Sequence, residues 1–205
     1  MSLVACIGPV YIKNKHSGLV LHVRGRGRNQ CVFQYKQNEK PVKNQLFKCQ
    51  WLSETLTSKP SFMIVSEHTN KVLQVTGSRS SACTRLIQKY YSGVLRQLFH
   101  LEYYRGYAII VSAYSGRVLT VPSGKKKSRF GVAHVRRRNS DNQMWSFELA
   151  SSTRRIVTAN DNPNYFSYTL AKNMYLYHYT IRYLTVSKCS IKNEYNEDNI
   201  VEYIN

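Results

Sequence analysis

The segment HSGLVLHV, residues 16–23, is the first of three related stretches in this chain. The second is HTNKVLQV, residues 68–75, and the third is YSGRVLTV, residues 114–121. Each has a Gly or Asn at its third position, and both residue types tolerate the positive φ angle of a tight hairpin turn. Apolar side chains then alternate, as they do along a half-buried β-strand. The three stretches therefore predict three equivalent hairpins.

The similarity continues on both sides of these hairpins at fixed spacing. Relative to the turn residue, an isoleucine stands six residues before, a leucine three after, a valine five after, a glutamine 27 after and an aromatic residue 29 after. These positions are Ile12, Ile64 and Ile110; Leu21, Leu73 and Leu119; Val23, Val75 and Val121; Gln45, Gln97 and Gln143; and Phe47, Phe99 and Trp145. The chain therefore contains three internal repeats, and their equivalence governs the prediction of the fold.

Each repeat has the pattern of four short strands, and residues 1–150 lack helical periodicity. The expected strands are 9–15, 19–25, 31–36 and 45–51; 61–67, 71–76, 84–90 and 97–103; and 107–113, 117–122, 131–136 and 143–149. Three such units fit an all-β fold, the β-trefoil, in which a closed barrel with a hairpin cap leaves no exposed sheet edge. A β-propeller also has four-stranded units, but three blades are too few for it.

The repeats carry a family resemblance in SGLVLHV…NQLF, TNKVLQV…RQLF and SGRVLTV…NQMW. These stretches resemble the ricin B-chain type of lectin repeat, with its Gln-x-(Trp/Phe) signature, over about residues 9–150. The resemblance implies a β-trefoil with the signature aromatic in a shared core, and a carbohydrate-binding function. In that family an Asp in each repeat accepts hydrogen bonds from sugar hydroxyls. An aromatic ring stacks under the sugar, and an amide before the signature Gln binds another hydroxyl.

This sequence departs from the family pattern at the acidic position, which the resemblance places at His22, Gln74 and Thr120. The amide position holds Asn44, Arg96 and Asn142. Tyr35 and Tyr90 are the candidate stacking rings, with Arg136 nearest in the third repeat. The candidate carbohydrate-binding residues are His22, Tyr35, Asn44, Gln45, Gln74, Tyr90, Gln97, Thr120, Asn142 and Gln143. Either the pockets are remodelled for another sugar, or the amides only satisfy buried backbone groups and sugar binding has been lost.

The net charge of +19 is concentrated in residues 1–150, which hold 24 basic and six acidic residues. Three clusters provide the candidate anion-binding residues: Arg24, Arg26 and Arg28; Lys125, Lys126, Lys127 and Arg129; and Arg136, Arg137 and Arg138. Like charges this close repel one another, and an anionic partner would offset the repulsion. Sulfated or otherwise acidic glycans, nucleic acid and anionic membrane surfaces are candidate partners. Residues 125–138 also resemble a nuclear import signal, and a generally basic soluble protein is the simplest alternative.

No motif for catalysis is present, since the chain lacks HExxH, GxSxG and a Gly-rich phosphate loop. We therefore expect no catalytic residue, no cofactor and no metal site. The five cysteines form no CxxC pair and are expected to be reduced, with a Cys31–Cys49 bridge as the alternative. No apolar run reaches the ~20 residues of a membrane span, and no signal peptide is evident, so the cytoplasm is the default location.

The domain organisation expected is a β-trefoil over residues 1–150 and a C-terminal extension over residues 151–205. The extension holds eight tyrosines and no glycine. It is a packing or dimerisation element, a disordered tail, or sequence not selected to fold.

The sequence as a whole favours a non-enzymatic, lectin-like protein that binds acidic glycans. A nucleic-acid or protein interaction scaffold with vestigial sugar pockets is the main alternative. A β-trefoil inhibitor that presents one loop to a protease is a third.

Overall fold

The computed structural model describes residues 3–27, 29–52, 59–78 and 84–150. The extension predicted for residues 151–205 lies outside these ranges. The described residues form thirteen β-strands and four short 3₁₀ turns, without an α-helix. The expectation of an all-β fold is therefore confirmed.

The strands follow the three repeats in order. The first repeat contains β1 (Leu3–Asn14), β2 (Val20–Val23), β3 (Val32–Tyr35) and β4 (Phe47–Leu52). The second contains β5 (Phe62–Ser66), β6 (Val72–Val75), β7 (Thr84–Lys89) and β8 (Phe99–Tyr104). The third contains β9 (Tyr107–Ser112), β10 (Val118–Thr120), β11 (Phe130–Gly131), β12 (Ala133–Val135) and β13 (Trp145–Leu149). The single strand predicted for 131–136 is thus interrupted at Val132, between β11 and β12.

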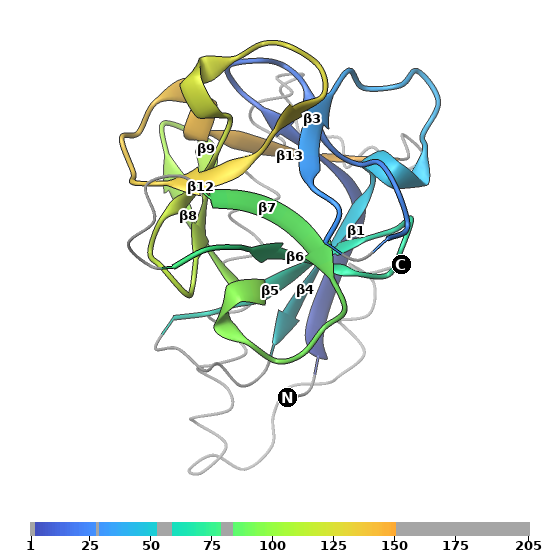
Figure 1. Cartoon of the computed structure of the whole chain (residues 1–205), viewed down its shortest axis with the longest axis vertical. Coiled ribbons are helices and arrows are strands. Elements are labelled where there is room, and N and C mark those ends of the chain that lie inside the picture. Colours follow the sequence, from blue (N-terminus) through green and yellow to red (C-terminus); the bar gives the residue numbers. More distant parts are fainter. Residues whose placement is uncertain (1–2, 28, 53–58, 79–83, 151–205) are drawn as a thin grey trace, which may run out of the picture.

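Six of the strands close a barrel. β1 pairs with β4 and β13, β5 pairs with β4 and β8, and β9 pairs with β8 and β13, all antiparallel. The remaining strands form hairpins that pair across repeat boundaries, β3 with β11 and β7 with β12. Figure 1 shows β7 and β12 side by side in this cap. This arrangement of barrel and cap is the β-trefoil.

The recurring apolar positions meet in one core. All three residues of the isoleucine, leucine, valine and aromatic sets are fully buried and belong to a single cluster of packed side chains. The indole nitrogen of Trp145 donates a hydrogen bond to the carbonyl oxygen of Leu119, 3.1 Å away. This bond satisfies the one polar atom of the aromatic triplet, as a buried N–H requires.

The turn residues have the backbone geometry that the sequence predicts. The φ angles are 68° at Gly18, 52° at Asn70 and 68° at Gly116. These angles lie in the left-handed region, where glycine and asparagine are favoured. Each hairpin therefore begins at an equivalent turn, and the strand that follows enters the core in the same register.

The signature glutamines differ from the prediction in their secondary structure. They were expected to begin strands, but each is the last residue of a 3₁₀ turn: η1 (Lys43–Gln45), η2 (Leu95–Gln97) and η4 (Asp141–Gln143). A fourth turn, η3, spans Pro122–Gly124. The cysteine alternative is also wrong, because Cys31 and Cys49 are both free thiols.

Candidate binding pockets and basic loops

The signature glutamines hold the loop that follows the third strand of each repeat. All three side chains are buried. Their amide nitrogens donate to the carbonyl oxygens of Lys36, Tyr90 and Arg136, over 2.7, 2.8 and 3.0 Å. Their amide oxygens accept from the backbone N–H groups of Asn38, Ser92 and Arg138, over 3.0, 2.8 and 2.7 Å. Gln45, Gln97 and Gln143 therefore use both ends of their amides to fix the conformation of this loop.

The residues at the family's acidic position lie in equivalent places. His22 pairs with Phe33, Gln74 with Ile87, and Thr120 with Ala133, each across the hairpin of its own repeat. The same registers place Lys89, rather than Tyr90, at the position equivalent to Tyr35, because Tyr35 pairs with Val20 and Lys89 with Val72. The three pockets therefore share one backbone frame but differ in side chains.

The first pocket is aromatic. The imidazole of His22 stacks on Phe33, with ring centroids 4.9 Å apart, and lies 5.0 Å from the ring of Tyr35. Its Nε2 is 3.4 Å from the side-chain nitrogen of Asn44. Among the described residues, His22 Nδ1 and Asn44 Oδ1 are buried polar atoms without a hydrogen-bond partner. Unpaired polar atoms are unusual in buried positions, and both of these atoms have almost no accessible surface.

His22 is neutral at physiological pH. Burial, with smaller contributions from the nearby positive charges of His68 and Arg129, lowers the pKa of His22 to about 4. A neutral imidazole has one nitrogen that donates and one that accepts a hydrogen bond. Because the side-chain nitrogen of Asn44 can only donate, His22 Nε2 accepts from it and Nδ1 carries the proton. The first pocket lacks the charged acceptor of the family pattern.

The second pocket is an open groove of about 820 Å³. Gln74 lies in it and accepts a hydrogen bond from the side chain of Gln97, 3.0 Å away. Arg96 and Lys89 also line it, as does Tyr114 from the third repeat. This groove combines amide, aromatic and cationic groups in one place.

The third pocket is closed by its own side chains. Thr120 is buried and donates to the carbonyl oxygen of Val118, 2.9 Å away, while Gln143 donates to its hydroxyl over 3.3 Å. Asn142 donates to the carbonyl oxygen of Val121 over 2.8 Å and accepts from Ser140 over 2.7 Å. The polar groups of this site are thus already engaged within the protein.

A second polar triplet, which the sequence analysis missed, fastens each repeat to the one before it. Its members are Gln34, Gln88 and His134, one from each third strand, and all are fully buried. Gln34 donates to the carbonyl oxygens of Lys125 and Lys127, over 2.6 and 2.9 Å. Gln88 donates to those of Gly25 and Gly27, over 2.5 and 3.1 Å. His134 Nε2 lies 3.2 Å from the carbonyl oxygen of Thr76.

The hydroxyl groups of the hairpin turns complete this triplet. Ser17 donates to Gln34 over 2.7 Å, Thr69 donates to Gln88 over 2.8 Å, and the hydroxyl of Ser115 lies 3.1 Å from His134 Nδ1. These turn residues stand directly before Gly18, Asn70 and Gly116 in the sequence. The recurring hydroxyl was therefore the sequence signal that could have revealed the triplet.

Two of the loops fastened in this way are basic clusters. The loop with Arg24 and Arg26 lies against β7, and the loop with Lys125, Lys126, Lys127 and Arg129 lies against β3. The Arg129 guanidinium is 5.8 Å from the ring centroid of Tyr35. Within the described ranges, none of these six side chains forms an ion pair. Arg28 lies outside the described residues.

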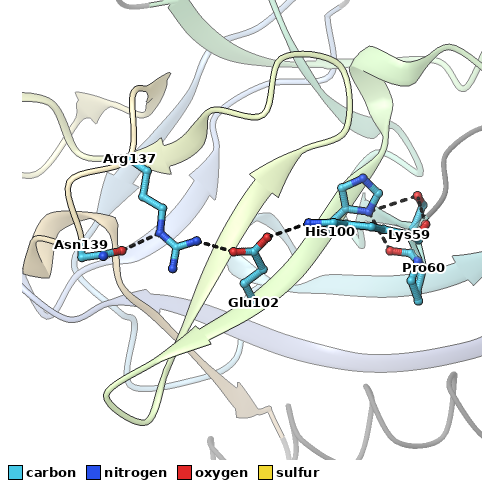
Figure 2. Close-up of polar contacts among 7 residues, drawn as sticks. Lys59, Pro60, His100, Glu102, Arg137 and Asn139 are labelled. Carbon is cyan, nitrogen blue, oxygen red and sulfur yellow. Dashed lines mark hydrogen bonds and ion pairs between the residues drawn. The ribbon is translucent and has the colours of Figure 1, made fainter.

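The third basic cluster is partly neutralised. The side chain of Arg137 forms an ion pair with Glu102, which also contacts Lys59 at 3.3 Å, and Asn139 orients the guanidinium over 2.6 Å (Figure 2). Partial burial opposes ionisation of Glu102, but hydrogen bonds from Arg137 and Lys59 outweigh it and lower its pKa. The side chains of Arg136 and Arg138 are exposed. This cluster offers fewer uncompensated charges than the other two.

Comparison with known proteins agrees with the fold. Residues 7–89 match the family described as ricin-type beta-trefoil lectin domain-like. The designed three-fold symmetric protein ThreeFoil is 27% identical, with a TM-score of 0.58 over 68% of this chain and 96% of ThreeFoil. The Macrolepiota procera ricin B-like lectin, solved with lactose, is 16% identical, with a TM-score of 0.57 over 73% of this chain and 98% of the lectin.

Another similar structure is an exo-beta-1,3-galactanase from Clostridium thermocellum. It is 21% identical, with a TM-score of 0.61 over 70% of this chain, and the match spans only 30% of the galactanase. No curated protein sequence matches the chain. The described part of the chain is a β-trefoil, and the match over residues 7–89 confirms the resemblance of its repeats to ricin-type lectin-like domains.

Two further features concern the described residues alone. They contain no helix with the length and apolarity needed to cross a membrane. They also contain no cluster of three or more His, Cys, Asp or Glu side chains arranged to hold a metal ion.

Proposed function

We propose that the protein binds carbohydrates without transforming them, and that its basic loops favour anionic glycans. Support for carbohydrate binding comes from the match of residues 7–89 to a lectin-like family and from the trefoil shared with a ricin B-like lectin. Support for the anionic preference comes from the charge distribution around the pockets.

One observation carries the anionic preference. The cations of the loops around Arg24 and Lys125 have no acidic partner among the described residues. Acidic side chains instead pair elsewhere, for example Glu148 with Lys13 and Glu67 with Lys48. Hydrogen bonds from the side-chain amides of Gln34 and Gln88 to backbone carbonyl oxygens hold these loops in place despite the repulsion between their charges. A negatively charged ligand would relieve that repulsion.

The pockets themselves are compatible with an anionic sugar. The family's acidic position holds neutral side chains, namely His22, Gln74 and Thr120. A carboxylate there would repel an acidic sugar, and its replacement removes this obstacle. The amides and the imidazole still offer hydrogen bonds to hydroxyl groups. The protein is therefore suited to glycans that carry sulfate or carboxylate groups.

Nucleic-acid binding is the second candidate. It is favoured by the exposure of Tyr90 and Tyr91, at 54% and 44%, beside a strand that contacts a basic loop. Single-stranded nucleic acids stack their bases on such rings next to positive charge. In this alternative the sugar pockets have no ligand.

A glycan array read at low and at high salt concentration, together with a single-stranded RNA titration, tests the proposal. We expect binding to sulfated or uronate-containing glycans that weakens with salt, because screening reduces attraction between exposed charges. Absence of binding to every glycan, with tight binding to RNA, would favour the scaffold alternative instead.

A matched pair of variants assigns the effect to the loops. The double variant Arg24→Gln/Arg26→Gln removes two charges from a basic loop, and Lys40→Gln/Arg105→Gln removes two exposed charges elsewhere. At about 0.5 kcal/mol for each exposed contact, the first pair should weaken glycan binding roughly five-fold. The second pair should change it little. Equal effects would show that only net charge matters.

A further inference from the structure

The groove of the second repeat differs from the other two pockets in charge. Arg96 stands in it at the position that Asn44 and Asn142 occupy in the first and third repeats. Lys89 is a second cation in the same groove, where the first repeat has Tyr35 and the third has Val135. The groove also receives Asn29 from the first repeat and Tyr114 from the third. It is therefore a composite site built from all three repeats.

Arg96 is held in one orientation before any ligand arrives. Its guanidinium lies over the ring of Tyr114, 4.1 Å from the centroid, and its Nη2 donates to the Tyr114 hydroxyl over 2.9 Å. Its Nη1 donates to the carbonyl oxygen of Gly77. These two bonds leave three of the five guanidinium N–H groups for a ligand. No acidic side chain of the described residues pairs with Arg96 or with Lys89.

The rest of the groove fits a sugar ring. Gln74 lies at the position that reads sugar hydroxyls in the family pattern, and its amide is fixed by Gln97 over 3.0 Å. Ile87 and Val94 provide apolar surface for the carbon face of a ring. Since an arginine fork binds a carboxylate or sulfate through paired hydrogen bonds, it would select for an acidic substituent on that ring.

We propose that this groove binds a single acidic sugar unit, with Gln74 contacting its hydroxyls and Arg96, assisted by Lys89, holding its carboxylate or sulfate. The inference deepens the proposed function and rests on it. It assigns selectivity for the acidic group to one groove, whereas the basic loops act on the charge of the whole glycan. The two contributions can be separated with a monosaccharide because Arg24, Arg26 and Lys125 do not line the groove.

Nuclear magnetic resonance titration with four monosaccharides tests this assignment. The acids are galacturonate and galactose 6-sulfate, which separate the carboxylate from the sulfate. The neutral counterparts are the methyl ester of galacturonate and galactose. We expect at least one acid to bind about ten-fold more tightly than its neutral counterpart, as charge-assisted hydrogen bonds predict. The shifted resonances should include the side-chain amide of Gln74.

Variants give the decisive comparison. Arg96→Asn introduces the residue of the other two repeats and should abolish the preference for the acid, whereas Arg105→Asn removes the same charge from an exposed turn and should preserve it. Lys89→Gln provides a second test at an exposed residue and should reduce the preference. An unchanged preference in Arg96→Asn would overturn the assignment. If no monosaccharide binds while salt-sensitive glycan binding remains, the assignment to this groove is overturned and the proposed function stands. Loss of both would defeat both proposals.

Discussion

The side-chain amide of Gln34 in the first repeat lies 2.6 Å from the carbonyl oxygen of Lys125 in the third. It therefore holds a basic loop of one repeat over a strand of another. Gln88 and His134 make the equivalent contacts at the other two repeat boundaries. The position of the loops relative to the pockets depends on these buried groups as well as on the core.

Replacement of Gln34 by alanine should release the loop of residues 125–129. The loss of hydrogen bonds to two backbone carbonyl oxygens should lower the free energy of unfolding by about 1–3 kcal/mol. Hydrogen exchange at the amide of Arg129, which donates to the backbone of residue 34, should accelerate. Lys126→Gln on the same loop is the control. Unchanged exchange in Gln34→Ala would show that the amide does not hold the loop.

Replacement of Phe99 by alanine tests the shared core. Phe99 is fully buried, and truncation of such a ring typically lowers the free energy of unfolding by about 3–5 kcal/mol. Val94→Ala, at a residue that is 42% exposed, should change it by less than about 0.5 kcal/mol. Denaturant unfolding of both variants measures the difference. Similar small losses at the two sites would contradict the placement of Phe99 in the core.

Two histidines should make the protein less stable in mild acid. Burial lowers the pKa of His22 to about 4 and also lowers the pKa of His134, from an ordinary value of 6.5. Both favour the neutral form in the folded state, so their contribution is complete above about pH 6.5. It is lost as the pH falls from there through the folded pKa values, because the unfolded chain binds protons first.

His134→Gln, which supplies the residue present at the equivalent positions 34 and 88, should reduce this acid sensitivity. Thermal unfolding between pH 7 and pH 5 compares the variant with the wild-type protein. The midpoint of the variant should fall less over this range. An identical fall in the two proteins would exclude His134 as a contributor.

The ion pairs of Glu102 should contribute less to the stability of the folded protein than the histidines do. This contribution should be lost at a lower pH. Although partial burial opposes ionisation, Arg137 and Lys59 lower the pKa of Glu102, so its contribution is present above about pH 4.5 and is lost as the pH falls below that value. Since the partners are about one-third or more exposed, Glu102→Gln should lower the free energy of unfolding by no more than about 1 kcal/mol. Urea unfolding at pH 7 measures it, and a loss of several kcal/mol would contradict the solvent screening assumed.

The repeating core could be predicted from the sequence because its positions recur at constant spacing. Ile64, Leu73 and Phe99 have the same spacing from their turn residue as the equivalent residues of the other repeats, and all three are buried in the structure. The spacing of the third strands is not constant, because Gln34 stands 16 residues after Gly18, whereas Gln88 stands 18 after Asn70. Loop length differs between repeats, and only strand pairing reveals the register.

The same difference in loop length affects the candidate stacking rings. Tyr35 and Tyr90 look equivalent in the sequence, yet pairing places Lys89 opposite Val72, as Tyr35 lies opposite Val20. Nor could the sequence predict that Arg96 and Tyr114, which belong to different repeats, line the same groove. Their proximity depends on the closure of the trefoil, which brings together residues from separate repeats.

Calorimetry at two ionic strengths, with a sulfated oligosaccharide and its desulfated counterpart, tests whether the wild-type protein prefers anionic glycans. The sulfated chain should bind more tightly, and this advantage should shrink as salt screens the charges. Equal affinity for the two oligosaccharides, or binding of neither, would contradict this preference.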